Sequence, residues 1–218
     1  MGCEHMLPPH RDGSRLDEPL ELEQLPSSRE WEGRIAYLDR DGVLNVGLEE
    51  YVNAPDDVVI LLGADSALGR LRRAGYRICV VTNQSPINRG LWDHENLAGI
   101  HQRLRSILLR GDGDAVIDLI LYSPYSPWEG SWARKPNPGM LEAGRQLLDS
   151  AHSNPGSEPE ILYGHEWLDR PDESTSVLVG DRSTDMGAAE SYGVMGIKCD
   201  SSLGLASVVD AILGDGNE

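Results

Sequence analysis

The sequence has no phenylalanine, only three cysteines, and no apolar run of the roughly 18 residues that a membrane-spanning helix needs. The cysteines, Cys3, Cys79 and Cys199, are far apart and odd in number, which fits neither a disulfide framework nor a CxxC zinc pair. The N-terminus also lacks the charged-then-apolar order of a signal peptide. We therefore expect a protein of the reducing cytoplasm that is not attached to a membrane.

Basic residues are scarce as well. The chain carries 19 Lys plus Arg against 36 Asp plus Glu, which gives a formal net charge of -17 at pH 7. This charge disfavours broad electrostatic attraction to a nucleic-acid backbone or an anionic membrane. Hydrophobic residues make up 39% of the 218 positions, enough for one sizeable core. We expect a monomer or weak homo-oligomer with a small metabolite as its partner, without nucleic acid or membrane.

The composition and hydrophobic pattern of the chain change near Arg34. Residues 1–33 are rich in Pro, Ser and acidic groups and lack a sustained period, which predicts an acidic, partly disordered tail. Over residues 34–218, short apolar runs alternate with helically spaced stretches, which is typical of an α/β domain with a Rossmann-like, doubly wound parallel sheet. The expected strands are 35–38, 78–81, 117–121, 177–179 and 194–197. The expected helices are 64–74, 93–110 with Asp93 as cap, 138–148, 183–192 and 203–213.

An acidic insertion at about residues 149–176 replaces a short helix-to-strand turn. Such a connection lies at the N-terminal ends of parallel strands, whereas ligands of open α/β sheets bind beyond the carboxyl ends. We expect the insertion to lie away from the chemistry unless it folds back a long way. The loops that follow strands, at 42–63, 83–92 and 123–136, are better placed to contact a substrate.

Chemically useful side chains follow four successive predicted strands. Each has an ordinary explanation when taken alone, since Asp and Gly form turns, strand ends are often polar, and carboxylates favour helix starts. Together, in the order carboxylates, hydroxyl, lysine, carboxylates, they predict one site at the carboxyl edge of the sheet. The residues are Asp39 and Asp41, then Thr82 and Asn83, then Arg134 and Lys135, then Asp181 and Asp185.

This order resembles the haloacid dehalogenase superfamily of phosphatases. The resemblance implies that Asp39 attacks phosphorus to form an aspartyl-phosphate, while Asp41 protonates the leaving oxygen and later deprotonates water. Lys135 and Thr82 would hold the phosphoryl oxygens.

The same resemblance implies a Mg²⁺ ion. Its ligands would be the Asp39 carboxylate, the main-chain carbonyl of Asp41 and the Asp181 carboxylate, with Asp185 acting through a water molecule.

The resemblance narrows to the heptose-bisphosphate and histidinol-phosphate phosphatases. It is carried by the stretches at 39–46, 51–52, 80–85, 89–90 and 134–140, and the chain between Asp41 and Asn83 is too short for a large cap domain. A capless enzyme is implied, with heptose 1,7-bisphosphate as the first substrate and histidinol phosphate as the second. Asn83, Arg89 and Arg134 would bind the phosphosugar, although Arg89 could equally be a solvated surface charge.

Two features depart from the heptose enzymes. Their loop before the Arg-Lys-Pro stretch usually binds zinc through Cys and His, but residues 123–133 contain neither, so we expect no zinc. Packing of Tyr125, Trp128 and Trp132 would hold the loop instead. Pro86 stands where the subgroup usually has Gly.

Two functions of other classes stay open at this point. One is a nucleic-acid 3′-phosphatase, which the charge disfavours, and the other is a non-catalytic interaction module, which the complete residue set disfavours. Removal of residues 1–30 is expected to leave activity intact.

Overall fold

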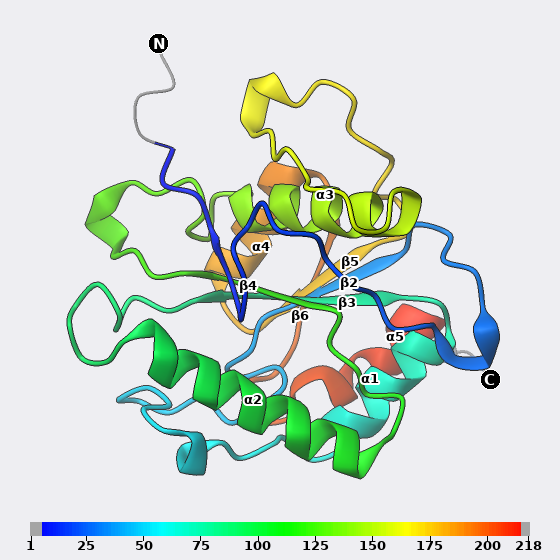
Figure 1. Ribbon diagram of the computed structural model, residues 1–218. Coiled ribbons are helices and arrows are strands. Elements are labelled where there is room, and N and C mark those ends of the chain that lie inside the picture. Colours follow the sequence, from blue (N-terminus) through cyan, green and yellow to red (C-terminus); the bar gives the residue numbers. More distant parts are fainter. Residues whose placement is uncertain (1–5, 215–218) are drawn as a thin grey trace.

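The computed structural model describes residues 6–214 and contains a six-stranded sheet with the strand order β1-β4-β3-β2-β5-β6 (Figure 1). All neighbouring strands run parallel except β1, which pairs antiparallel with β4. The predicted α/β class with a mainly parallel sheet is therefore confirmed. The strands are β1 (His10–Arg11), β2 (Ile35–Leu38), β3 (Arg77–Asn83), β4 (Leu119–Ser123), β5 (Val177–Gly180) and β6 (Met195–Lys198).

Helices cover both faces of the sheet, with α3 and α4 on one face and α1, α2 and α5 on the other (Figure 1). The α-helices are α1 (Ala64–Arg73), α2 (His94–Gly111), α3 (Gly139–Ser153), α4 (Ser183–Tyr192) and α5 (Val209–Leu213). Short 3-10 helices are η1 (Pro26–Ser28), η2 (Pro55–Asp57), η3 (Pro127–Glu129), η4 (Gly164–Glu166) and η5 (Gly204–Ser207).

The central strand β2 is buried on both faces, and its side chains alternate between two cores. Ala36 and Leu38 belong to the core under α1 and α2, whereas Ile35 and Tyr37 belong to the core under α3 and α4. Each fully buried aliphatic side chain contributes about 1.5–3 kcal/mol, so this strand is fixed firmly in the middle of the sheet. Its carboxyl end therefore gives the residues that follow it a rigid base.

Most predicted elements are confirmed with small shifts of their ends. Asp93 caps α2, because its Oδ1 accepts a hydrogen bond from the N–H of Asn96 at 2.9 Å. The single helix predicted over 203–213 is wrong: the segment divides into η5 and α5, with Val208 between them at φ -124°. Helix α3 continues to Ser153, beyond the predicted end at 148.

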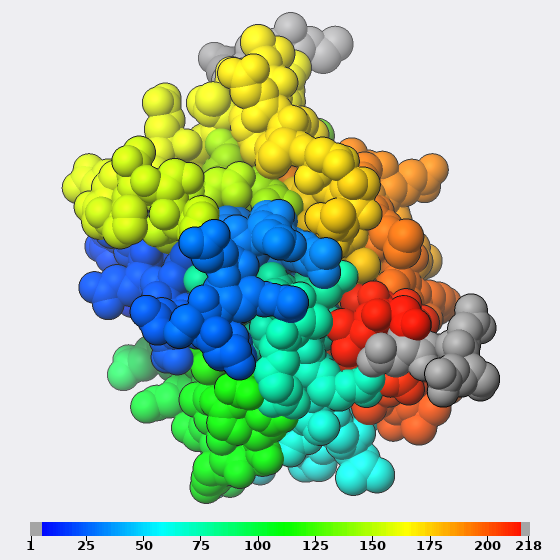
Figure 2. All heavy atoms as spheres, turned by 90° about the vertical axis from the view of Figure 1, so that its right-hand side faces the viewer, coloured from blue at the N-terminus to red at the C-terminus, as the bar shows by residue number. Residues whose placement is uncertain are grey.

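The N-terminal segment from residue 6 packs against the domain, which differs from the partly disordered tail predicted for residues 1–33. Residues 1–5 lie outside the described part of the chain. Leu20, Leu25 and Trp31 are buried in the core under α3. In Figure 2 this blue segment lies on the face that forms the right-hand side of Figure 1, between the yellow-green spheres above it and the green and cyan spheres below it. Burial of these apolar side chains offsets the conformational entropy that the segment loses on ordering. The Pro-rich, acidic composition, taken alone, predicted disorder.

The insertion after α3 folds back along that helix. Arg145 in α3 forms a buried ion pair with Glu173 at 2.5 Å, close to the start of β5. Gln146 exchanges hydrogen bonds with the backbone of Leu162, and the N–H of Gly164 donates to Glu142 at 3.1 Å. The insertion thus reaches the N-terminal end of α3, nearer to the carboxyl edge of the sheet than its position in the sequence suggested.

The connection from β2 to β3 contains a loop, η2 and α1, and no cap domain. The expectation of a capless fold is therefore confirmed. None of the described helices is both long enough and apolar enough to span a membrane.

Candidate active site

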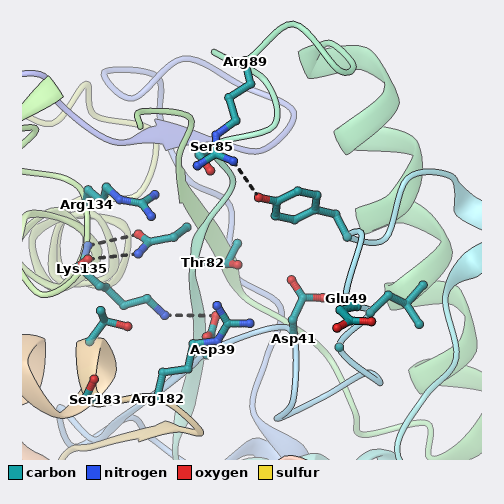
Figure 3. A pocket seen from close by; sticks show the side chains of 15 residues that line it. Asp39, Asp41, Glu49, Thr82, Ser85, Arg89, Arg134, Lys135, Arg182 and Ser183 are labelled. Carbon is teal, nitrogen blue, oxygen red and sulfur yellow. Dashed lines mark hydrogen bonds and ion pairs between the residues drawn. The ribbon is translucent and has the colours of Figure 1, made fainter. Parts of the chain in front are cut away.

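A pocket of about 560 Å³ lies beyond the carboxyl ends of β2, β3 and β5 (Figure 3). The structure brings every predicted catalytic and substrate-binding residue to this pocket. These residues are Asp39, Asp41, Thr82, Asn83, Arg89, Arg134 and Lys135. No residue of the 149–176 insertion lines it, so the insertion stays outside the pocket despite its fold-back.

Asp39 follows β2 directly and lies at the base of the pocket, only 7% exposed. Its Oδ1 accepts the N–H of Arg40 at 2.8 Å and lies 3.1 Å from Lys135 Nζ. Burial raises the pKa of Asp39 to about 6, with Asp185 and Asp41 adding to the rise and Lys135 opposing it. Among the described residues, none donates a hydrogen bond to Asp39 Oδ2, which leaves this oxygen available to a ligand.

Lys135 is buried between two carboxylates. Its Nζ lies 2.6 Å from Asp185 Oδ1 and donates to the carbonyl of Val81 at 2.7 Å, in addition to its contact with Asp39. Burial alone would lower the pKa of Lys135, but Asp39 and Asp185 outweigh it and raise the pKa above the ordinary value. The lysine is therefore a fixed positive charge under the pocket.

The carboxylates of Asp39, Asp181 and Asp185 form a group whose nearest oxygen atoms all lie within 4.8 Å of one another. Asp181 Oδ1 is buried and has no hydrogen-bond partner among the described residues. An oxygen-only cluster with an unpartnered buried carboxylate oxygen fits a hard cation such as Mg²⁺. Because Asp185 contacts Lys135 and its Oδ2 accepts the N–H of Arg182 at 3.0 Å, Asp39 and Asp181 are the better-placed direct ligands.

Two glycines make room for this cluster. A Cβ on Gly42 would come 2.7 Å from Asp181 Oδ2, and the backbone of Gly42 adopts φ +77°. A Cβ on Gly180 would come 2.2 Å from the Cβ of Asp185. A side chain at either position would collide with a carboxylate of the site, so glycine is required at both.

Asp41 points into the pocket and is held by Arg40. The Arg40 Nη2 group lies 2.9 Å from Asp41 Oδ2, while Asn45 donates to Oδ1 at 2.9 Å and Gln84 to Oδ2 at 3.3 Å. Burial would raise the pKa of Asp41, but Arg40 and these hydrogen bonds outweigh it and hold the pKa below the ordinary value. Asp41 is thus oriented by three neighbours and ionised in the ligand-free protein.

Thr82 and Asn83 end β3 at the same edge. The Thr82 hydroxyl accepts a hydrogen bond from Gln84 at 2.8 Å and lines the pocket. The Asn83 side chain donates to the carbonyl of Lys135 and accepts its N–H, both at 3.1 Å. The side chain of Asn83 therefore fixes the backbone of Lys135, which leaves its own N–H as the group for a ligand.

The rim of the pocket is basic although the chain as a whole is acidic. Arg89, Arg134 and Arg182 line it, and neither Arg89 nor Arg134 has a carboxylate within 4.0 Å among the described residues. Burial and the neighbouring Arg89 lower the pKa of Arg134. Arg89 donates to the Tyr51 hydroxyl at 3.1 Å (Figure 3). Its guanidinium lies 5.5 Å from the ring centre of Trp128. Like charges that face one another without a counter-ion favour binding of an anion.

The loop at 123–136 is held by protein contacts. Ser131 and the N–H of Ala133 donate to the carbonyl of Leu7 at 3.0 and 3.3 Å, and Trp132 donates to the buried Glu142 at 2.7 Å. Arg170 from the insertion also pairs with Glu142. Of the three aromatic residues expected to pack, Trp128 is 75% exposed, so it does not anchor the loop.

Sequence reasoning missed several pocket residues. Arg182, Ser183 and Thr184 line the pocket beside Asp181, and Arg40 and Gln84 orient Asp41. Gln84 lies within the Thr-Asn-Gln stretch, which could have indicated it. Nothing in the sequence indicated the role of Arg40, because a residue between two aspartates is expected only to separate them.

Comparison with known proteins agrees with this geometry. A family model described as HAD-hydrolase-like matches residues 132–202, the part of the chain that carries Lys135, Asp181 and Asp185. The crystal structure of D,D-heptose 1,7-bisphosphate phosphatase from B. bronchiseptica, complexed with magnesium and phosphate, superposes with a TM-score of 0.63 at 25% identity. That match covers 84% of this chain and 99% of the other. The fold and the site thus define a HAD-like hydrolase.

Two sequence relatives narrow the class. A D-glycero-D-manno-heptose-1,7-bisphosphate 7-phosphatase from Thermosynechococcus vestitus is 31% identical in an alignment that covers 77% of this chain and 79% of that protein. The enzyme named D-glycero-beta-D-manno-heptose-1,7-bisphosphate 7-phosphatase from Pseudomonas aeruginosa is 40% identical over 104 residues, or 48% of this chain. The chain spans 57% of the length of the Pseudomonas relative. The chain belongs to the heptose-bisphosphate phosphatase family of HAD-like hydrolases.

Proposed function

We propose that the protein is a Mg²⁺-dependent phosphomonoesterase that hydrolyses a small phosphorylated sugar, with heptose 1,7-bisphosphate as the first candidate. The observation that carries the proposal is the arrangement around Asp39. This buried carboxylate faces the pocket beside Lys135 Nζ at 3.1 Å, and Asp41 points into the same pocket. A nucleophile, a fixed cation and a second carboxylate are the groups that phosphoryl transfer requires.

The reaction proceeds in two steps. In the first step, an Asp39 oxygen forms a bond to phosphorus while the bond from phosphorus to the leaving oxygen breaks, and Asp41 gives its proton to that oxygen. In the second step, a water oxygen forms a bond to the phosphorus of the aspartyl-phosphate while the bond from phosphorus to the Asp39 oxygen breaks. The water gives one proton to Asp41, inorganic phosphate leaves, and the Asp39 carboxylate is regenerated. Lys135 holds the Asp39 carboxylate in place, and Thr82 donates to a phosphoryl oxygen.

Asp41 needs a proton before the first step, although Arg40 holds its pKa low in the ligand-free protein. A bound phosphate ester places negative charge beside Asp41, and a nearby like charge raises the pKa of a carboxyl group. Substrate binding thus shifts Asp41 toward the protonated form that the first step uses. The ionised form returns when the leaving group departs with the proton.

Asp39 and Asp181 of the cluster described above would hold the metal ion. The resemblance to the superfamily adds the main-chain carbonyl of Asp41 as a third ligand and gives Asp185 a place behind a water molecule. Mg²⁺ bound there supplies positive charge to the phosphoryl oxygens, which lowers the repulsion between the phosphate and the two aspartates. Zinc has no part in the proposal. The loop at 123–136 contains no Cys or His, and Leu7 and Glu142 provide its contacts.

The basic rim supports a substrate with a second anionic group. Arg89 and Arg134 lie on the pocket wall without carboxylate partners in the described part of the chain, and Arg89 lies at the opposite end of the pocket from Asp39 in Figure 3. A phosphate attached to the far end of a sugar would pair with these groups while the reacting phosphate faces Asp39. The named relatives act on such a bisphosphate, which agrees with this interpretation.

A panel of phosphate esters tests the proposal. Heptose 1,7-bisphosphate, sugar monophosphates, histidinol phosphate and a 3′-phosphorylated DNA end are each incubated with the full chain, once with Mg²⁺ and once with EDTA. We expect the fastest release of phosphate from the heptose bisphosphate, only with Mg²⁺, and no release by Asp39→Asn. The exposed Asp169→Asn is the matched control and should retain wild-type rates.

The panel also separates the alternatives. Turnover of histidinol phosphate alone, or of the DNA end alone, would contradict the sugar substrate while keeping the phosphatase. Absence of turnover throughout would favour an interaction module. A wild-type rate for Asp39→Asn would contradict the proposed nucleophile.

A further inference from the structure

A chain of buried polar side chains connects Asp41 to the N-terminal segment. Arg40, which holds Asp41, is 1% exposed, and its Nη1 lies 3.4 Å from Nε2 of the fully buried His101 in α2. The other ring nitrogen of His101 lies 2.9 Å from Oδ1 of Asp12, just after β1. The path therefore runs from the pocket, through α2, to a residue that the sequence placed in a disordered tail.

The direction of these hydrogen bonds follows from the groups themselves. An arginine can only donate, so the Nε2 atom of His101 must accept from Arg40. An ionised aspartate can only accept, so the Nδ1 atom of His101 carries the proton and donates to Asp12. Burial lowers the pKa of His101, which favours the same neutral ring. The ring thus has one defined tautomer and one orientation, set by Asp12 on one side and Arg40 on the other.

Asp12 is itself held in place. Its N–H donates to the carbonyl of Ile120 at 3.0 Å, and its Oδ2 lies 3.5 Å from Nη2 of Arg105. The pairing of β1 with β4 brings Asp12 to this position, because His10 stands opposite Tyr122. The pairing of the short strand β1 with β4 therefore places Asp12 against His101, which in turn contacts the arginine that holds Asp41.

We infer that Asp12 and His101 are positioning residues for Asp41, and this inference rests on the proposed function. They fix the guanidinium of Arg40 by occupying Nη1, so that its Nε and Nη2 groups hold the Asp41 carboxylate in one orientation. Without His101, the buried Nη1 group lacks a partner and Arg40 turns toward another acceptor. Asp41 then loses the orientation that proton transfer to the leaving oxygen requires. The inference predicts that removal of residues 1–30 lowers activity, the opposite of the expectation from the sequence.

A comparison of leaving groups tests the inference. The departing oxygen of an alkyl or sugar phosphate needs a proton from Asp41, whereas nitrophenolate departs without one. The value of kcat/KM reports the steps up to departure of the leaving group. We therefore measure kcat/KM for a sugar phosphate that the wild type hydrolyses and for p-nitrophenyl phosphate, with Mg²⁺, for His101→Leu, Asp12→Ala and Asp12→Asn.

We expect kcat/KM for the sugar phosphate to fall roughly tenfold or more in His101→Leu and Asp12→Ala, within the range that general acid catalysis contributes. For p-nitrophenyl phosphate, the fall should be less than about threefold. Asp12→Asn keeps an acceptor oxygen and should show a smaller loss of the same kind, which covers the case that the other variants fold poorly. Trp31→Phe is the control in the same N-terminal segment. It removes the hydrogen bond from Trp31 to the carbonyl of Arg34, which lies away from the site, and should change kcat/KM for both esters by the same factor.

Equal loss on both esters, or no loss on either, in variants that unfold cooperatively would overturn the inference and leave the proposed function intact. A wild-type protein that hydrolyses neither ester would overturn the proposed function and this inference with it.

Discussion

Replacement of Lys135 by methionine tests the electrostatics of the site. Lys135 Nζ has three close acceptors, at 2.6 Å on Asp185, 2.7 Å on Val81 and 3.1 Å on Asp39. The lysine is 2% exposed and Asp185 is fully buried. Methionine keeps much of the side-chain volume but removes the charge, so two buried carboxylates lose their cation.

Removal of one partner from a buried ion pair costs about 3–5 kcal/mol, because the remaining charge is left uncompensated. We expect Lys135→Met to lower the free energy of unfolding in EDTA by this amount. Mg²⁺ should restore part of the loss, since it binds the same carboxylates, by about 2.7 kcal/mol when its concentration is 100 times the dissociation constant. The double variant Lys135→Met/Asp185→Asn should also be more stable than Lys135→Met in EDTA, because one unpaired charge is gone.

Urea unfolding followed by tryptophan fluorescence, with and without Mg²⁺, measures these differences. Lys198, the other lysine of the chain, is exposed on β6, and Lys198→Met should change stability by no more than about 0.5 kcal/mol. If Lys135→Met unfolds at the wild-type urea concentration in EDTA, the carboxylates do not depend on Lys135 and the electrostatic description is wrong.

Three further predictions concern single residues. In EDTA, the pKa of Asp39 is raised from 3.8 to about 6, so the folded state binds more protons and its stability should fall as pH rises through this window. The contribution is about 3 kcal/mol, and unfolding curves of Asp39→Asn should lack it. Arg89→Gln should raise KM for a sugar bisphosphate about 10- to 100-fold and leave KM for a monophosphate nearly unchanged, and Arg110→Gln should affect neither in steady-state assays. Gly180→Ala should lower stability by about 1–3 kcal/mol and weaken Mg²⁺ binding in calorimetry, whereas Gly113→Ala, which meets no atom within 4 Å, should do neither.

The sequence was sufficient to predict strands β2 to β6 and to bring the main residues of the candidate site to one edge of the sheet, because the signal is local. Each polar group directly follows an apolar strand, and parallel strands present their carboxyl ends at one edge. Asp39, Thr82, Lys135 and Asp181 could therefore be brought together without knowledge of distances. The geometry of their contacts, such as the reciprocal pairing of Asn83 with the backbone of Lys135, depends on side-chain packing and could not be predicted.

Features that depend on distant contacts were missed. Strand β1 has only two residues and pairs with β4 about 110 positions away, so no local pattern indicates it. The composition of residues 1–33 predicted disorder, although Leu20, Leu25 and Trp31 contribute to the core. The fold-back of the insertion depends on Glu142, whose buried carboxylate receives Trp132 and Gly164, and a glutamate within a helix gives no sign of such a role.

Identification of the phosphorylated residue tests the central claim most directly. The full chain is mixed with substrate and Mg²⁺, quenched in acid and reduced with borohydride, which converts an aspartyl-phosphate to homoserine. Trypsin cleaves after Arg34 and Arg40, so the peptide from Ile35 to Arg40 contains Asp39 and no other carboxylate side chain. Mass spectrometry should find homoserine at position 39 in the wild type, and none without substrate. Homoserine in a peptide that carries Asp41, Asp181 or Asp185 instead, with position 39 unchanged, would contradict the account.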